Sequence, residues 1–305
     1  MKTPIRVVLL VLVIPGVFQF SPIKQAYGER LVDISTICLL DSGDCRTVDY
    51  VIEKIADAAD RGEPDLVVAP LTPFLSFREG EEPADLEAFM SIARSRRTYL
   101  AVALVEHARD GKEYYTSVLI GRNGAIVGKY RKTHGLADDP EALGGDIPVF
   151  DTDFGKIGFG IGTDFYFPEV SWVEYMKGAD ILVWQHYPER FREHFQWIPL
   201  LKARALDCHA HMVTAMYADP RCYITNRHQS GMQGAAWGRS MILNRVGTPI
   251  ADTGYEEGVV AAVVDLDKRK RDPYSEYEAE NIFFVNNLGD RTAFSPLSEP
   301  WRPPS

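Results

Sequence analysis

The side chains best suited to chemistry stand directly after apolar segments of the chain. Lys132 closes the run Gly128-Lys-Tyr-Arg-Lys132, where a lysine after an apolar strand is by itself most often a surface residue. Thr163 and Asp164 follow a second, glycine-rich apolar run. The hydroxyl of Thr163 becomes a nucleophile only where a neighbouring base takes its proton. Neither position defines a reaction alone, so the chemistry depends on which other residues the fold brings beside them.

Apolar runs that predict strands alternate with helical periodicities over most of the chain. Strands are expected at residues 31–40, 65–70, 99–106, 114–121, 125–130, 147–151, 156–161, 181–184, 212–215, 240–243 and 258–264. Helices are expected at residues 47–60, around 86–93, at 168–178 and at 194–209. The Asn123-Gly124 step predicts a tight hairpin, and Pro168 and Gly178 suit the start and the end of a helix. The alternation predicts a single α/β domain, because helices then cover the faces of a sheet.

Four stretches follow one another in a specific order. They are Asp65-Leu-Val-Val-Ala-Pro70, the run from Gly128 to His134, the run from Gly155 to Glu169, and Lys202-Ala-Arg-Ala-Leu-Asp207. In this order and spacing the chain resembles the nitrilase, or carbon–nitrogen hydrolase, superfamily over residues 31–268. The resemblance implies an α/β fold of the αββα four-layer sandwich type. It also implies association through the helix layers into a homodimer or a higher homo-oligomer.

The resemblance implies a catalytic triad of cysteine, glutamate and lysine. The cysteine thiolate would attack an amide or nitrile carbon and form a thioester. The glutamate would act as general base and acid, and the lysine would stabilise the oxyanion. Lys132 matches the lysine, but Leu71 follows Pro70 where the family has its glutamate. Gly162 stands two residues before Asp164, where the family has its cysteine. Two of the three chemical groups are therefore missing from their expected positions.

The resemblance also assigns supporting roles to several acidic residues. Glu141 matches a second glutamate that helps to orient the site in many family members, and we expect it, like Lys132, to be vestigial. Asp164 and Glu169 are expected to position the turn that follows the glycine-rich strand. Asp207 is expected to hold a backbone or arginine contact.

The sequence therefore predicts a nitrilase-fold protein that is catalytically inactive, with a ligand-binding or scaffolding role and no cofactor. Lys132 in an apolar pocket could hold a small anionic or amide-like ligand. The alternative is an amidase-type hydrolase of non-peptide carbon–nitrogen bonds with an atypical active site. That site would use Thr163 or a displaced Glu79.

Two other kinds of site have weaker support. The glycines of Gly158-Phe-Gly-Ile-Gly162 look like part of a dinucleotide-binding loop, but they lie in and at the end of a strand instead of opening a helix. His209 and His211 have a spacing that can ligate a metal from a strand, although a helix end followed by a strand start explains them more simply.

The composition is that of an ordinary globular protein, with 46% hydrophobic and 25% charged residues among 305. The formal net charge of −10 argues against nucleic acid and against an anionic membrane surface as partners.

The N-terminal residues have a pattern that is typical of a targeting segment. Residues 1–28 combine Lys2 and Arg6 with a short apolar run, which predicts a signal peptide or, if it is not cleaved, an N-terminal anchor. The expected product is an exported protein, secreted or periplasmic, with its hydrolase-like domain at 29–270 and a tail at 271–305. Export would permit a Cys38–Cys45 disulfide, which the sequence leaves open.

Overall fold

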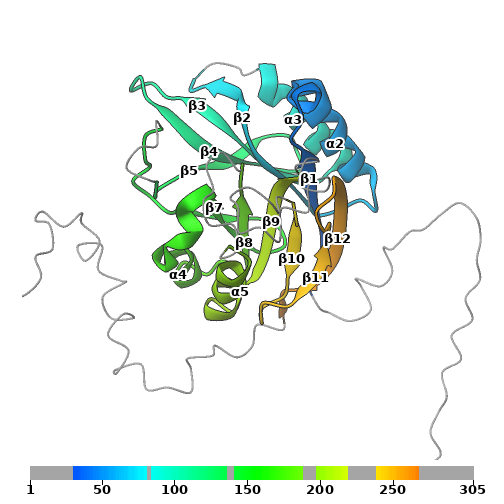
Figure 1. Cartoon of the computed structure of the whole chain (residues 1–305), viewed down its shortest axis with the longest axis vertical. Coiled ribbons are helices and arrows are strands. Elements are labelled where there is room, and N and C mark those ends of the chain that lie inside the picture. Colours follow the sequence, from blue (N-terminus) through cyan, green and yellow to red (C-terminus); the bar gives the residue numbers. More distant parts are fainter. Residues whose placement is uncertain (1–29, 81–83, 136–140, 188–196, 219–237, 268–305) are drawn as a thin grey trace, which may run out of the picture.

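Two β-sheets and two pairs of α-helices make up the part of the chain that the structure describes (Figure 1). The computed structural model describes residues 30–80, 84–135, 141–187, 197–218 and 238–267. The first sheet contains β1 (Leu31–Leu40), β2 (Leu66–Arg78), β3 (Tyr99–His107), β4 (Glu113–Ile120), β5 (Ile126–Arg131) and β12 (Gly258–Asp265). The second sheet contains β6 (Val149–Asp151), β7 (Lys156–Ile161), β8 (Ile181–Gln185), β9 (His211–Ala218), β10 (Met241–Leu243) and β11 (Pro249–Asp252).

The two sheets pack face to face and are joined where the ends of two of their strands pair. The ends of β1 and β9 pair in parallel at Cys38–Leu40, so the strand order runs β5-β4-β3-β2-β1-β9-β8-β7-β6. Gln185 of β8 is fully buried and crosses the interface between the sheets. Its side chain accepts a hydrogen bond from Ser117 Oγ at 2.7 Å and donates to the carbonyl of Ala69 at 2.6 Å. A buried amide of the second sheet that is satisfied by groups of the first sheet fixes the relative position of the two sheets.

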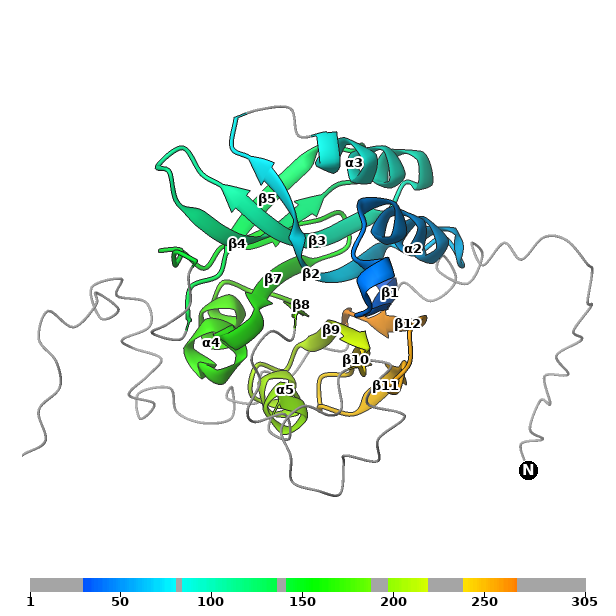
Figure 2. The same cartoon turned by 45° about the horizontal axis from the view of Figure 1, so that its top comes forward.

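Helices cover the outer face of each sheet. Helices α2 (Val48–Asp60) and α3 (Ala84–Arg96) pack on the first sheet, and α4 (Pro168–Met176) and α5 (Trp197–Asp207) pack on the second. Figures 1 and 2 show the two pairs on opposite sides of the molecule. This helix–sheet–sheet–helix order confirms the predicted αββα sandwich.

Local sequence signals account for several element boundaries. Thr47 caps α2 by accepting a hydrogen bond from the amide of Tyr50. Pro168 occupies the first turn of α4, and Gly178 follows that helix with φ +89°. The Asn123-Gly124 turn joins β4 to β5 as predicted, with Gly124 at φ +79°. The prediction missed β11, a short strand that pairs with β10.

The strand β2 is much longer than predicted. We expected it to end at Pro70, but it runs on to Arg78 through two prolines. Its parallel pairing with β3 shifts register between Val68 and Leu71 and again between Thr72 and Ser76. Proline cannot donate to a strand ladder, and such irregularities are where a strand tolerates it. The tertiary pairing therefore overrides the local proline signal.

Cys38 and Cys45 are not bridged. Both are free cysteines, one buried in β1 and the other in the 3₁₀ turn Gly43–Cys45. Burial raises the pKa of Cys38 to about 11, so this thiol is inert at neutral pH.

The predicted signal segment, residues 1–28, and the tail, residues 271–305, lie outside the described residues, so both boundaries stay predictions. None of the described helices is long and apolar enough to cross a membrane.

Candidate active site

Lys132 and Gly162 meet where β5 and β7 end. Lys132 directly follows β5 and is only 5% exposed. Its ammonium nitrogen lies 5.6 Å from the centre of the Tyr115 ring, a cation–π distance. A Cβ atom built on Gly162 would lie 3.9 Å from Lys132 Cε. The two positions that the resemblance assigns to the nucleophile and the lysine are therefore neighbours.

Gly162 directly follows β7, whose bounds match the strand predicted at 156–161. β7 ends at Ile161, and Gly162–Tyr166 forms a 3₁₀ turn. Gly162 has φ +56°, the left-handed region that L side chains rarely adopt. The chain turns sharply here and presents residue 162 toward Lys132. Catalytic nucleophiles of other hydrolase folds also sit on a strained turn after a strand.

Asp164 holds the Lys132 segment against this turn. Its fully buried carboxylate accepts hydrogen bonds from the Tyr130 hydroxyl at 2.7 Å and from the amide of Ile161 at 2.8 Å. It also accepts from the amides of His134 at 2.8 Å and Thr133 at 3.2 Å. One carboxylate thus ties together the residues on both sides of Lys132 and the end of β7, which confirms its predicted positioning role.

The site contains a histidine that the sequence analysis missed. His186 directly follows β8, is 5% exposed, and lies with Nδ1 3.5 Å from the Cβ position of residue 162. Its ring stacks on Trp184, with 5.0 Å between ring centres and 12° between planes. Trp184 in turn donates from its indole nitrogen to the Gly162 carbonyl at 2.8 Å. The only sequence signal was a histidine at the end of a buried strand, a pattern that core residues also produce.

Leu71 and Glu79 provide no base for this site. Leu71 is 2% exposed and belongs to the main apolar core. Glu79 follows β2 and pairs with Lys129 at 3.3 Å and Arg131 at 3.4 Å. These two cations alternate along β5 with Tyr130, whose hydroxyl reaches Asp164, so they lie on the opposite face of the strand. Glu79 is therefore held on the face that points away from Gly162.

The hydroxyl of Thr163 makes a structural hydrogen bond. Its hydroxyl donates to the carbonyl of His134 at 2.7 Å. Thr163 lies in the 3₁₀ turn that follows β7. In this arrangement the hydroxyl proton is used to hold the His134 loop.

The segment that begins at Glu141 runs beside the ends of β4 and β5. The amide of Ala142 donates to the Glu113 carbonyl at 2.8 Å, and the amide of Gly144 donates to the Lys132 carbonyl at 2.7 Å. The segment is therefore next to the Lys132 backbone, as the family resemblance requires. The role of the half-buried Glu141 carboxylate stays a prediction.

Asp207 and Glu169 occupy outer positions. Asp207 lies 3.8 Å from Arg204 on the same helix, which is the arginine contact that was predicted. Glu169 is exposed in the first turn of α4, where a negative charge favours the helix dipole.

The dinucleotide and metal interpretations gain no support. Gly158 is covered by Glu174 of α4, whose Cδ would lie 2.5 Å from a Cβ at position 158. His211 is buried in β9, and burial lowers its pKa to about 4. Among the described residues, no three histidine, cysteine, aspartate or glutamate side chains gather closely enough to hold a metal ion.

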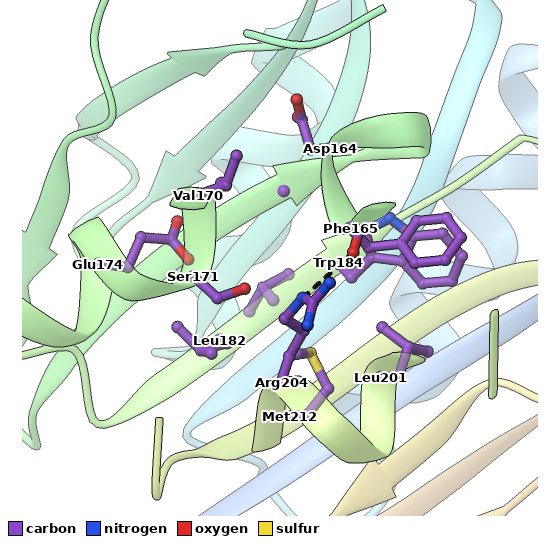
Figure 3. A pocket seen from close by; sticks show the side chains of 12 residues that line it. Asp164, Phe165, Val170, Ser171, Glu174, Leu182, Trp184, Leu201, Arg204 and Met212 are labelled. Carbon is purple, nitrogen blue, oxygen red and sulfur yellow. Dashed lines mark hydrogen bonds between the residues drawn. The ribbon is translucent and has the colours of Figure 1, made fainter. Parts of the chain in front are cut away.

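A small cavity lies on the outer side of the second sheet, beneath α4 and α5 (Figure 3). Its volume of about 20 Å³ is room for a single water molecule. The polar residues that line it include Asp164, Ser171, Glu174 and Arg204. Lys132 and His186 are not among the lining residues, so this cavity is separate from the Lys132 site.

Glu174 in this cavity leads to a stability prediction. It is 2% exposed, and its Oε1 has no hydrogen-bond partner among the described residues. Burial, together with the charge of Asp164, raises the pKa of Glu174 well above its usual value. A carboxyl whose pKa is raised on folding destabilises the fold above the pKa that it has in the unfolded chain, about 4.5, and this penalty grows as the pH rises from there. We expect Glu174→Leu to stabilise the fold by about 1–2 kcal/mol at pH 8, and by less at pH 4.

Urea unfolding at the two pH values measures this difference. Glu169→Gln, an exposed change on the same helix, serves as the control and should alter stability little. Equal or lower stability of Glu174→Leu at pH 8 would contradict a stability penalty from the buried Glu174 carboxyl.

Comparisons with known proteins agree with this fold and these motifs. The sequence model of the carbon-nitrogen hydrolase family matches residues 48–274. Omega-amidase NIT2-B of Xenopus laevis is 30% identical over 220 residues, which are 65% of this chain and 74% of that protein. The structure of Saccharomyces cerevisiae Nit3, described as a member of branch 10 of the nitrilase superfamily, superposes with a TM-score of 0.69 at 20% identity. The superposition covers 82% of this chain and 97% of Nit3.

A further solved structure is a glutamate-to-leucine mutant of the amidase from Nesterenkonia sp. AN1. It carries the acetamide moiety of fluoroacetamide on its active-site cysteine, and superposes with a TM-score of 0.62 at 18% identity over 82% of this chain and 96% of that one. The family match spans most of the present chain, and the fold and motif order agree with it. The chain belongs to the carbon-nitrogen hydrolase family of the nitrilase superfamily.

Proposed function

We propose that this protein has lost the thioester chemistry of its family and acts as a binding or scaffolding module, with a small carboxylate or amide-like ligand at Lys132. One observation carries the proposal: the residue that the turn presents to Lys132 is Gly162, which has no atom that could attack a carbonyl. A covalent pathway without its nucleophile has no first step.

The lack of a nucleophile at Gly162 supports lost catalysis more strongly than the lack of a carboxylate at Leu71. The Nesterenkonia amidase mutant that has leucine in place of a glutamate still carries the acetamide group on its cysteine. A glutamate-to-leucine change in a family member therefore need not prevent reaction at the cysteine. At position 162 of this chain, in contrast, no thiol is available to react.

The amidase-type alternative is supported by kinship with the omega-amidases. It would require another nucleophile beside Lys132. Thr163 and Glu79, the candidates from the sequence, are engaged with the His134 carbonyl and with Lys129 and Arg131. These contacts favour the inactive interpretation.

A scaffolding role would use the helix layers. Met176 of α4 and Leu206 of α5 are 45% and 54% exposed, which is compatible with the self-association that family membership suggests. Export through residues 1–28 is part of the same proposal and rests on the N-terminal sequence.

Ammonia release tests the proposal. The purified protein and Lys132→Ala are incubated with a panel of amides, nitriles and N-carbamoyl compounds. We expect ammonia from neither protein above the uncatalysed rate. Turnover by the parent that disappears in Lys132→Ala would show that the site is catalytic and that its nucleophile had been overlooked.

A further inference from the structure

We propose that His186 and Lys132 together form a binding site for a small carboxylate, in the space that a side chain at position 162 would fill. This inference rests on the proposed function and deepens it, because it names a second binding residue. The two side chains approach the same point from different elements, β8 and the end of β5. From the Cβ position of residue 162, His186 Nδ1 is 3.5 Å away and Lys132 Cε is 3.9 Å away.

His186 is firmly held in this position. Its backbone amide donates to the Ala215 carbonyl at 3.1 Å, and its ring lies flat against Trp184. Gln185, the preceding residue, anchors the end of β8 to the first sheet through Ser117 and Ala69. The imidazole therefore keeps its place beside Gly162 without any ligand.

Lys132 is held just as firmly on the other side. Its amide donates to the Tyr115 carbonyl at 2.9 Å, and its own carbonyl accepts from Gly144 at 2.7 Å. Asp164 fixes the residues before and after it. The Lys132 backbone is therefore fixed, and its buried side chain lies with the ammonium over the Tyr115 ring, which limits the side-chain entropy that binding costs.

The chemistry of these two groups selects the ligand. An ammonium only donates hydrogen bonds, and an imidazole can donate one. A carboxylate offers two acceptor oxygens and one negative charge, so it can bridge the two donors with charge-assisted hydrogen bonds. Both residues are only 5% exposed, and a buried site strengthens such contacts relative to water. A neutral amide of the same shape lacks the charge and should bind much less well.

Acetate is the probe, and acetamide is its neutral counterpart. Binding of each to the full chain is measured by NMR titration, with the parent protein, Lys132→Ala, His186→Ala, His186→Gln and Gly162→Ala. The methyl group of Gly162→Ala would occupy the proposed binding space at ordinary contact distance from both residues. Gly160→Ala is the matched control, since its methyl would contact only Trp184 and Asp164, at 3.6 and 3.7 Å.

We expect acetate to bind the parent at least tenfold more tightly than acetamide. Lys132→Ala and His186→Ala should each weaken acetate binding at least fivefold, and Gly162→Ala should abolish it. His186→Gln keeps a side-chain N–H and should retain part of the affinity, whereas Gly160→Ala should bind like the parent. Thermal unfolding of each variant identifies any loss of binding that comes from misfolding.

Three results would overturn the inference. Parent-like acetate binding by His186→Ala would leave Lys132 as the anion-binding residue and remove His186 from the site. Absence of acetate binding by the parent would refute the carboxylate site, while lack of ammonia release would still support the loss of catalysis. Equal binding of acetate and acetamide would show that charge does not select the ligand. Ammonia release by the parent would instead contradict the proposed function itself.

Discussion

Gly162→Cys should give a protein that iodoacetamide alkylates at residue 162 at least tenfold faster than at Cys45, at pH 7. The new Cβ would lie 3.9 Å from Lys132 Cε and 3.5 Å from His186 Nδ1, without a clash. A nearby ammonium lowers the pKa of a thiol, and a shift of one to two units from about 8.5 raises the thiolate fraction roughly tenfold or more. The left-handed backbone at position 162 costs a side chain about 1–2 kcal/mol, which the surrounding contacts can tolerate. Labelling rates are measured by mass spectrometry of the peptides.

Two companion variants make this result specific to Lys132. Gly160→Cys places a thiol two residues earlier, against Trp184 and Asp164, and should react slowly. Lys132→Ala in the Gly162→Cys background should remove most of the acceleration while keeping the site open. Gly162→Cys should still release no ammonia from amides, because alkylation needs only the thiolate, whereas amide hydrolysis also needs a general base, which Leu71 cannot supply. If residue 162 reacted no faster than Cys45, the turn would not present a side chain to Lys132 as we infer.

The elements of the fold were predictable because their signals are local and agree with one another. The helix at 48–60 has a cap and an apolar stripe, and the hairpin at Asn123-Gly124 has its turn residues in place. The length of β2 was not predictable, because Pro70 and Pro73 are strand breakers that only the register shifts against β3 accommodate. The length of β2 is therefore set by its pairing with β3, a separate segment of the sequence.

Part of the candidate site could likewise be predicted from the sequence, and part could not. The neighbourhood of Lys132 and Gly162 could be predicted from the order of the family motifs. His186 could not, because its place depends on the stacking against Trp184 and on the end of β8 lying beside the turn at Gly162. Neither of these contacts produces a recognisable residue spacing in the sequence. The same holds for Glu79, whose distance from the site follows from which face of β5 carries Lys129 and Arg131.

Asp164→Asn should lower the free energy of unfolding by about 3 kcal/mol, which for a domain of this size lowers the melting temperature by roughly 6–12 °C. Each carboxylate oxygen accepts from at least one backbone amide: Oδ2 from Ile161, and Oδ1 from Thr133 and His134. An asparagine must replace one of these acceptors with an NH₂ donor. Whichever way the amide is turned, a buried donor then faces another donor, and that loss is unavoidable in either rotamer.

Asp164→Asn should destabilise the Lys132 segment more than the rest of the domain. Amide hydrogen exchange at Ile161, or at Thr133 and His134 if the NH₂ group faces them, should speed up more than exchange in α2, because the amide that faces the NH₂ group loses its acceptor. Glu169→Gln, the same chemical change at an exposed acid five residues later, should shift stability by less than about 0.5 kcal/mol. A melting temperature for Asp164→Asn within a degree or two of the parent would mean that this carboxylate does not hold the Lys132 segment. Since both Lys132 and the turn at Gly162 depend on that carboxylate, the acetate affinity of Asp164→Asn should fall together with its stability.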